Sequence, residues 1–179
     1  MNEKQMSSYN AMVSKCKSTA AGPWRLSSEQ WVQQVIDCLG LLGGAGILRS
    51  VPMAQAILES GWGSKPYLFG IKATKADFLA VNAEESPTHE IIDGQSVHQS
   101  DYFFKDKSIR GNFINYVKYI QRMKPDFLAA SNTPDGFLSY LQKEPSYSTS
   151  PIYEKTILEI IQDNGLNVWD CAWTPSASD

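Results

Sequence analysis

The chain has little excess charge and no long apolar run. Its 179 residues include 16 Lys and Arg against 19 Asp and Glu, which gives a formal net charge of −3. This balance excludes the broad basic surface of proteins held on nucleic acid. No stretch approaches the ~20 apolar residues of a membrane span, and the first residues lack the apolar core of a secretory signal. We therefore expect no nucleic-acid partner, no membrane insertion and no general export signal.

Cysteine and histidine are also scarce. The three cysteines, Cys16, Cys38 and Cys171, are widely spaced and odd in number, which favours ordinary thiols over a disulfide framework. One bridge involving Cys171 stays open. The two histidines, His89 and His98, lack the spacing of a zinc site and are too local for a serine-hydrolase triad. No metal and no cofactor are expected.

The composition is that of one folded domain preceded by an arm. Hydrophobic residues make up 42%, aromatic residues 11% and charged residues 20%, which are globular values. Residues 1–23 are polar with little periodicity, so we expect a polar N-terminal arm there and a folded domain over 24–179.

Two amphipathic helices are predicted early in this domain. Ser27 and Gln30 form a capping box, and apolar residues then recur at helical spacing up to Gly43. Ser50 is predicted to cap a second, short apolar helix that has proline in its first turn and ends at Gly61.

One hairpin and three more helices are predicted in the remaining chain. Asp93-Gly94, within 88–104, is a strong two-residue hairpin turn. Helical periodicity returns after three capping residues, and the last helix ends at Asn164-Gly165; the caps are Ser108, Thr133 and Ser150. Trp169 and Trp173 should dock at least in part, because both free would form an odd exposed patch. The predicted fold class is α+β, mainly α.

Glu59 is the residue that most strongly suggests chemistry. It lies in the last turn of the predicted helix that ends at Gly61, where the partial negative charge of the helix disfavours an ionised carboxylate. Apolar neighbours and Trp62 add desolvation, so the pKa of Glu59 should rise, as a general acid requires. An exposed glutamate at a helix end is the other interpretation of the same spacing.

Residues 51–72, VPMAQAILESGWGSKPYLFGIK, closely resemble the catalytic stretch of bacterial glucosaminidases. These are the peptidoglycan hydrolases of glycoside hydrolase family seventy-three, whose flagellar members open the cell wall. The family pattern is a helix reading AQAxLESGWG followed by LFGIK. The resemblance implies that Glu59 is the general acid that protonates the glycosidic oxygen.

Later segments match the same family in the correct order, over about residues 30–165. Thr88-His89-Glu90 resembles its TxE hairpin, which implies a second carboxylate at Glu90. Residues 145–153 resemble GYATDPxY, which places the family's active-site tyrosine on Tyr147. This chain departs from the pattern in having Tyr67 in place of Asn and Ser150 in place of Asp.

The resemblance implies a lysozyme-like fold with a small β-hairpin lobe and a cleft between the two parts. Glu59 would donate the proton, and either Glu90 or the N-acetyl group of the sugar would assist the second half of the reaction. Tyr147 would orient the sugar. Candidate sugar-contacting aromatics are Trp62, Phe69 and Tyr153, for each of which core packing is the alternative.

The implied activity is that of an endo-β-N-acetylglucosaminidase on peptidoglycan glycan strands. A muramidase or a lytic transglycosylase on a related fold, and a non-catalytic wall-binding module, are the alternatives. With no export signal and no wall-binding repeats, we expect a protein made in the cytoplasm that acts in the periplasm or wall of a target cell. It would be a phage lysin or a type VI secretion toxin, and a toxin would have a cognate immunity protein that plugs the cleft.

Overall fold

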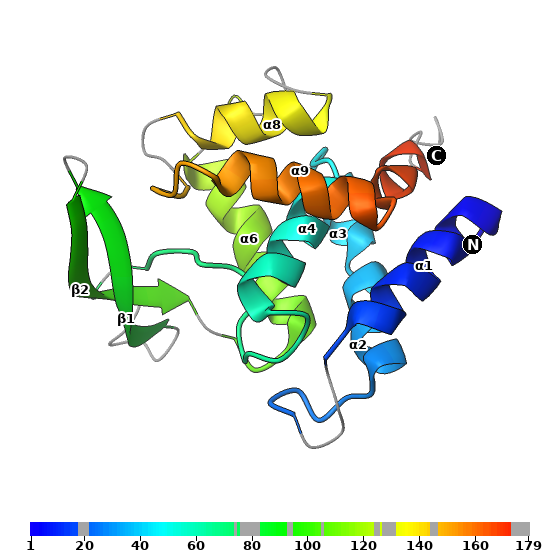
Figure 1. Ribbon diagram of the computed structural model, residues 1–179, viewed down its shortest axis with the longest axis horizontal. Coiled ribbons are helices and arrows are strands. Elements are labelled where there is room, and N and C mark those ends of the chain that lie inside the picture. Colours follow the sequence, from blue (N-terminus) through cyan, green and yellow to red (C-terminus); the bar gives the residue numbers. More distant parts are fainter. Residues whose placement is uncertain are drawn as a thin grey trace.

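Helices form most of the molecule, and a two-stranded sheet stands at one side of them (Figure 1). The computed structural model describes residues 1–17, 22–73, 75, 83–92, 95–104, 106–123, 126, 132–143 and 147–172. Its elements are α1 (Glu3–Lys15), α2 (Ser28–Asp37), α3 (Leu39–Gly44), α4 (Ser50–Ser60), β1 (Ala83–Ile92), β2 (Gln95–Phe104), α6 (Ile109–Met123), α8 (Pro134–Leu141), α9 (Tyr153–Asp163) and the 3₁₀ helix η1 (Leu166–Ala172). The predicted fold class, α+β and mainly α with a hairpin lobe, is confirmed.

Helix α4 lies at the centre of the helical body, packed against α8, α9 and η1. Its sequence, SVPMAQAILES, is apolar nearly all round, and a helix of that kind is stable only when it is surrounded. Nine of its residues are buried. The helix that carries Glu59 is therefore held on several sides before it reaches the surface at its C-terminal turn.

The N-terminus of α4 is capped from the far end of the chain. Asp170 Oδ1 accepts hydrogen bonds from the backbone amides of Arg49 (2.7 Å) and Ser50 (2.8 Å). A carboxylate satisfies free amides there and interacts favourably with the positive end of the helix. The prediction that Ser50 is the cap is wrong, because its buried hydroxyl makes no hydrogen bond within the described residues. Trp169, beside Asp170, is buried, which confirms that the tail docks; Trp173 lies outside the described residues.

The expectation of a polar arm outside the core is wrong over Glu3–Lys15, which forms α1. A capping box between Asn2 and Gln5 begins this helix, and Met12 lies in the core. The hydroxyl of Ser8 donates to the carbonyl of Asn164 (2.7 Å) and accepts from the indole of Trp169 (3.1 Å). Helix α1 is thus joined to the C-terminal segment by buried hydrogen bonds.

The helix caps and helix ends that were predicted from neighbouring residues are largely confirmed. Ser27 forms its capping box at the start of α2, and Thr133 caps α8. The predicted first helix is divided at Cys38, a buried free thiol, into α2 and α3. Ser150 is not the cap of α9, which begins after Ile152 without a side-chain cap. As predicted, α9 ends at Asn164-Gly165, where the glycine has a positive φ of 59°.

The hairpin is antiparallel, and its strands pair from Ala83 opposite Phe104 to Ile92 opposite Gln95. This confirms the predicted hairpin; the Asp93-Gly94 turn itself lies outside the described residues. The segment 71–73 joins the hairpin to the helical body. Phe104 donates its amide hydrogen to Ile71 (2.9 Å), and Ala73 donates its own to Tyr102 (2.7 Å). The hairpin therefore has a backbone attachment immediately after the loop that follows α4.

Candidate active site

Helix α4 ends in a tight left-handed turn. Three successive residues have positive φ: Gly61 at 55°, Trp62 at 58° and Gly63 at 76°. Glycine adopts this conformation without steric cost, which accounts for the glycines of the ESGWG segment. Ser60 ties the turn together, because its hydroxyl accepts from the Gly63 amide (2.9 Å) and its carbonyl accepts from the Lys65 amide (2.8 Å). The chain thereby reverses direction directly after Glu59.

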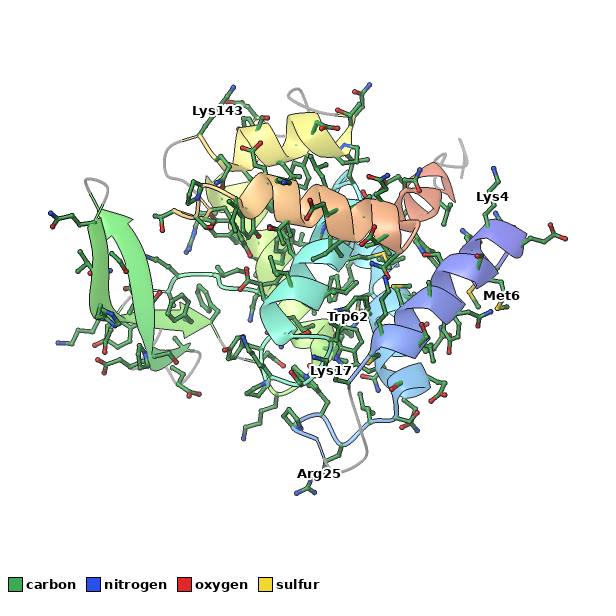
Figure 2. The ribbon with its side chains drawn as sticks, viewed as in Figure 1. Lys4, Met6, Lys17, Arg25, Trp62 and Lys143 are labelled. Atoms are coloured by element: carbon green, nitrogen blue, oxygen red, sulfur yellow. The ribbon has the colours of Figure 1, made fainter. Side chains whose placement is uncertain are left out.

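Trp62 is held in this turn by the end of α1 and the residues after it. Its carbonyl accepts from the backbone amide of Lys17 (2.9 Å) and from the thiol of Cys16 (3.4 Å), and the ammonium of Lys15 lies 6.0 Å from its ring centroid. Figure 2 shows Trp62 near Lys17, well away from the hairpin. Trp62 is not among the described residues that line the cleft described next, and it packs against the hydrophobic core.

A cleft of about 380 Å³ lies between the end of α4, the loop after it and the hairpin. Glu59 lines it from the helical side, and β1 and the end of β2 form the opposite wall. Among the described residues, those that line the cleft are Glu59, Pro66, Tyr67, Phe69, Gly70, Glu84, Ser86, Pro87, Thr88, Phe103 and Phe104. The structure thus brings Glu59 and the hairpin together across a cleft, as the sequence predicts.

Glu59 is half-buried at this cleft. Desolvation raises the pKa of its carboxyl above the ordinary value, and the positive charge of Lys65 opposes the shift. Gly70 faces the carboxyl closely: a Cβ at that position would lie 3.6 Å from Glu59 Oε2. A carboxyl whose pKa is raised by burial and that opens to a cleft can serve as a general acid.

The hairpin supplies an acidic residue, Glu84, to the other wall. The backbone of Glu90 pairs with Val97, and its side chain lies outside the described part of the structure. Glu84, which sequence reasoning missed, lines the cleft together with Ser86 and Thr88. Side chains two residues apart lie on the same face of a strand. Counting back in twos from Thr88 would therefore have identified Glu84 from the sequence.

Tyr147 lies in a cluster of tyrosines within electrostatic reach of Glu59. Its ring centroid is 6.5 Å from that of Tyr116, 5.9 Å from Tyr119 and 5.8 Å from Tyr153. Its hydroxyl is buried and has no hydrogen-bond partner of good geometry among the described residues. Burial first, then the neighbouring tyrosines and the charge of Glu59, raise the pKa of Tyr147. The predicted active-site tyrosine therefore lies within electrostatic reach of Glu59, and its hydrogen bonding with Tyr153 lowers the pKa of Tyr153.

Of the other two aromatic residues predicted to contact sugar, Phe69 lines the cleft and Tyr153 is buried in the core. Phe69 lines the cleft while its ring packs against Phe113 (5.1 Å between centroids) and Tyr116 (4.5 Å). Tyr153 is only 5% exposed and does not line the cleft. Tyr67, which the sequence marks only as a departure from the family pattern, is 38% exposed at the cleft. Exposure to the cleft is a tertiary property that the sequence pattern does not show.

Two other kinds of feature, a metal-binding cluster and a membrane-spanning helix, are absent from the described ranges. No group of three His, Cys, Asp or Glu residues there is arranged to hold a metal ion. No helix there has the length and apolar character needed to cross a membrane.

The fold is similar to several solved structures. N-acetylmuramoyl-L-alanine amidase from Staphylococcus aureus matches with a TM-score of 0.66 and 28% identity over 82% of this chain and 44% of that one. A peptidoglycan hydrolase mutant from Sphingomonas sp. A1 matches with a TM-score of 0.62 and 24% identity, over 78% of this chain and 96% of that one. The C-terminally truncated glycoside hydrolase domain of FlgJ from Salmonella typhimurium has a TM-score of 0.52 and 25% identity, over 74% and 93% respectively. The chain spans less than half the length of the staphylococcal protein, and these matches confirm the predicted fold.

A family model identifies the domain, although comparison with curated proteins gave no significant match. The glucosaminidase model, described as mannosyl-glycoprotein endo-beta-N-acetylglucosaminidase, matches residues 41–166. This range covers more than half of the chain and includes Glu59, the hairpin and Tyr147. The chain therefore belongs to the glucosaminidase family and is a glycoside hydrolase.

Proposed function

We propose that this protein hydrolyses the β-1,4 bond after N-acetylglucosamine in peptidoglycan strands, with Glu59 as the general acid. The observation that carries the proposal is a half-buried carboxyl with a raised pKa, open to a cleft that the hairpin closes on the opposite side. Two similar structures support the substrate, because they are described as a peptidoglycan hydrolase and a glycoside hydrolase domain.

In the first half of the reaction, Glu59 gives its proton to the glycosidic oxygen. The bond from that oxygen to the anomeric carbon breaks, and its electron pair stays with the departing oxygen. Burial raises the pKa of Glu59, so the protonated form that donates is more favourable in the cleft than it is for a carboxyl in water. We assign to Tyr147 the role that the family pattern implies, orientation of the sugar, although its hydroxyl is buried and it is not among the described residues that line the cleft.

The second half of the reaction needs a nucleophile at the anomeric carbon. A hairpin carboxylate can activate water, or the N-acetyl oxygen of the substrate can attack first. Glu90 is the carboxylate that the family pattern selects, and Glu84 is a further candidate because it lines the cleft. An inverting route requires carboxyl groups about 6.5–9.5 Å apart, whereas a retaining route with an enzymic nucleophile requires about 5–5.5 Å.

The decisive test is mass spectrometry of fragments released from purified peptidoglycan by the wild type and by Glu59→Gln. Products with N-acetylglucosamine at the reducing end are expected, and their release should fall by about 10²–10⁴-fold in the variant. Glu159→Gln, a surface glutamate with a 59% exposed side chain, is the matched control and should keep full activity. Near-normal release by Glu59→Gln would refute the assignment of the acid.

The same assay shows which hairpin carboxylate, Glu90 or Glu84, activates the water. Loss of activity in Glu90→Gln but not in Glu84→Gln assigns the base to Glu90, and the reverse result assigns it to Glu84. Full activity in both, and in the double variant, favours attack by the N-acetyl group.

The identity of the product also separates the alternative activities. Reducing-end N-acetylmuramic acid indicates a muramidase, and products without a free reducing end indicate a transglycosylase. No release by the wild type indicates a wall-binding module.

The proposed biological setting is an antibacterial toxin or lysin that acts on the wall of a target cell. A cognate immunity protein would block the enzyme by filling the cleft that exposes Glu59. Expression directed to the periplasm should lyse cells, whereas cytoplasmic expression should be tolerated. Equal toxicity in both compartments would count against a wall target.

A further inference from the structure

Gln55 is a buried polar residue that the proposed mechanism does not use. It lies on α4, one helical turn before Glu59, and is 0% exposed. Its side-chain oxygen accepts a hydrogen bond from the hydroxyl of Tyr116 (2.7 Å), and its nitrogen donates one to the hydroxyl of Tyr153 (2.9 Å). An amide buried in an apolar helix is costly unless it is bonded, so this residue is held by its two tyrosines.

The side-chain amide of Gln55 determines which group donates in each of its two hydrogen bonds. A tyrosine hydroxyl has one hydrogen to donate, whereas its oxygen can accept. Tyr116 gives its hydrogen to Gln55, and Tyr153 receives one from Gln55, so the hydrogen of Tyr153 is left for a different acceptor.

The groups around Tyr153 show where that hydrogen can go. Its ring lies 5.8 Å from that of Tyr147, whose buried hydroxyl has no partner of good geometry in the described part of the chain. After burial, the largest effect that raises the pKa of Tyr153 is the charge of Glu59. The hydroxyl hydrogen of Tyr153 can therefore be donated on the side of the cluster that contains Tyr147 and the proposed acid, Glu59.

We propose that Gln55 is a positioning residue that directs the hydroxyl of Tyr153 toward Tyr147 and Glu59, and so sets the hydroxyl of Tyr147 for the substrate. Tyr153 then acts through Tyr147 and does not contact sugar. This inference rests on the proposed function, because it assigns a supporting role at the same site.

The side chain at position 55 determines this direction. An ionised glutamate there would accept from both tyrosines and draw the Tyr153 hydrogen away from the acid. Methionine, of similar length, would leave both hydroxyls without their amide partner. In each case the buried hydroxyls lose their fixed arrangement, and the positioning of Tyr147 is lost with it.

A loss of stability alone would not distinguish positioning from packing, so the test measures kcat and KM separately. Gln55→Met, Tyr153→Phe and the double variant are assayed on soluble peptidoglycan fragments, well below the Tm of each. We expect Gln55→Met to lower kcat by about tenfold or more with KM nearly unchanged. We expect the double variant to be no slower than the slower single variant, because both changes remove one pathway.

Asn164→Leu is the matched control. Asn164 is also a buried side-chain amide, but it lies at the opposite end of α9 from Tyr153 and donates to the backbone carbonyl of Ile160 (2.8 Å). This variant should lose stability and keep kcat. An unchanged kcat in Gln55→Met, or losses that multiply in the double variant, would overturn the inference.

A second measurement does not depend on turnover. With carbon-13 at the tyrosine Cζ atoms, the signal of Tyr147 should move in Gln55→Met and stay in place in Asn164→Leu. An unmoved Tyr147 signal in Gln55→Met would overturn the positioning role even if the wild type proved inactive. Glu59→Gln in the kinetic assay reports on the proposed function separately: if that variant stays active while Gln55→Met is slow, only the assignment of the acid fails.

Discussion

The helical body and the hairpin lobe, which face each other across the cleft, are stabilised in different ways. In the body, α4 is surrounded by helices, and the buried amide of Gln55 on α4 is hydrogen-bonded. In the hairpin, the described side chains of β2 are exposed or half-buried, and the strands are joined to the body through segment 71–73. The comparison shows that the environment of Glu59 is set by the body, whereas the opposite wall depends on a few local attachments.

The difference has an energetic basis. An isolated two-stranded hairpin is marginally stable in water, so β1 and β2 depend on the body for their position. Regions with little buried apolar surface open at lower free energy than the whole protein. Hydrogen exchange should therefore be faster in β2 than in α4.

The largest expected difference is in the cost of removing an apolar side chain from each part. Leu138 in α8 is 0% exposed, and Leu138→Ala should lower the free energy of unfolding by about 2–5 kcal/mol. Val97 in β2 is half-buried, and Val97→Ala should cost less than half as much. Urea unfolding of both variants tests the comparison, and equal losses would contradict it.

The next effect concerns the cap that secures α4. Asp170→Ala removes the acceptor for the amides of Arg49 and Ser50 and should cost about 0.5–2 kcal/mol. For a domain of this size that is a fall in Tm of roughly 2–4 °C for each kcal/mol. Asp170→Asn, which keeps an oxygen acceptor, should cost less. If the two variants have the same Tm, the hydrogen bonds are not the source of the effect.

A third test exploits the raised pKa of Glu59. Between the ordinary carboxyl pKa of 4.5 and the raised value, the folded protein binds more protons than the unfolded chain, so its stability falls as pH rises through this window. Glu59→Gln removes this loss and should have a higher Tm than the wild type at neutral pH, an advantage that disappears near about pH 4. Thermal unfolding at both pH values measures it, and a variant less stable at neutral pH would show that the ionised carboxylate is stabilising.

The smallest effect is expected at the surface of the hairpin attachment. Lys72 Nζ lies 2.8 Å from Asp101 Oδ2, but the two side chains are 51% and 28% exposed. Such pairs contribute about 0–1 kcal/mol, and salt screens them. A double-mutant cycle with Lys72→Met and Asp101→Asn should give a coupling in this range that shrinks at high salt. A coupling above that range would mean that the hairpin is held as firmly as the body.

The sequence predicts best the features whose partners lie within one turn of chain. The caps at Ser27 and Thr133 are confirmed because each bonds an amide three residues later. Ser50 has the same appearance, yet Asp170, 120 residues away, takes its place. Residues 1–23 look like an arm for a similar reason, since Met12 and Ser8 find their partners only in the assembled core.

At the site, the sequence correctly predicts the direction of the pKa shift of Glu59, and the cause is the desolvation expected from its apolar neighbours. The pattern cannot show which way the neighbouring side chains face. Trp62 is adjacent to the acid in sequence but packs against the end of α1, whereas Glu84 and Tyr67 reach the cleft. The role of Gln55 also depends on tyrosines from two other helices, Tyr116 and Tyr153.

The long-range cap of α4 has a consequence for biosynthesis. Chains begin to fold from the N-terminal end during translation, and α4 is made well before Asp170. Until that carboxylate leaves the ribosome, the helix that carries the proposed acid lacks the acceptor for its first amides. Completion of the helix that carries Glu59 is thereby delayed to the end of synthesis, so a chain released early, before Asp170, would leave α4 without this cap.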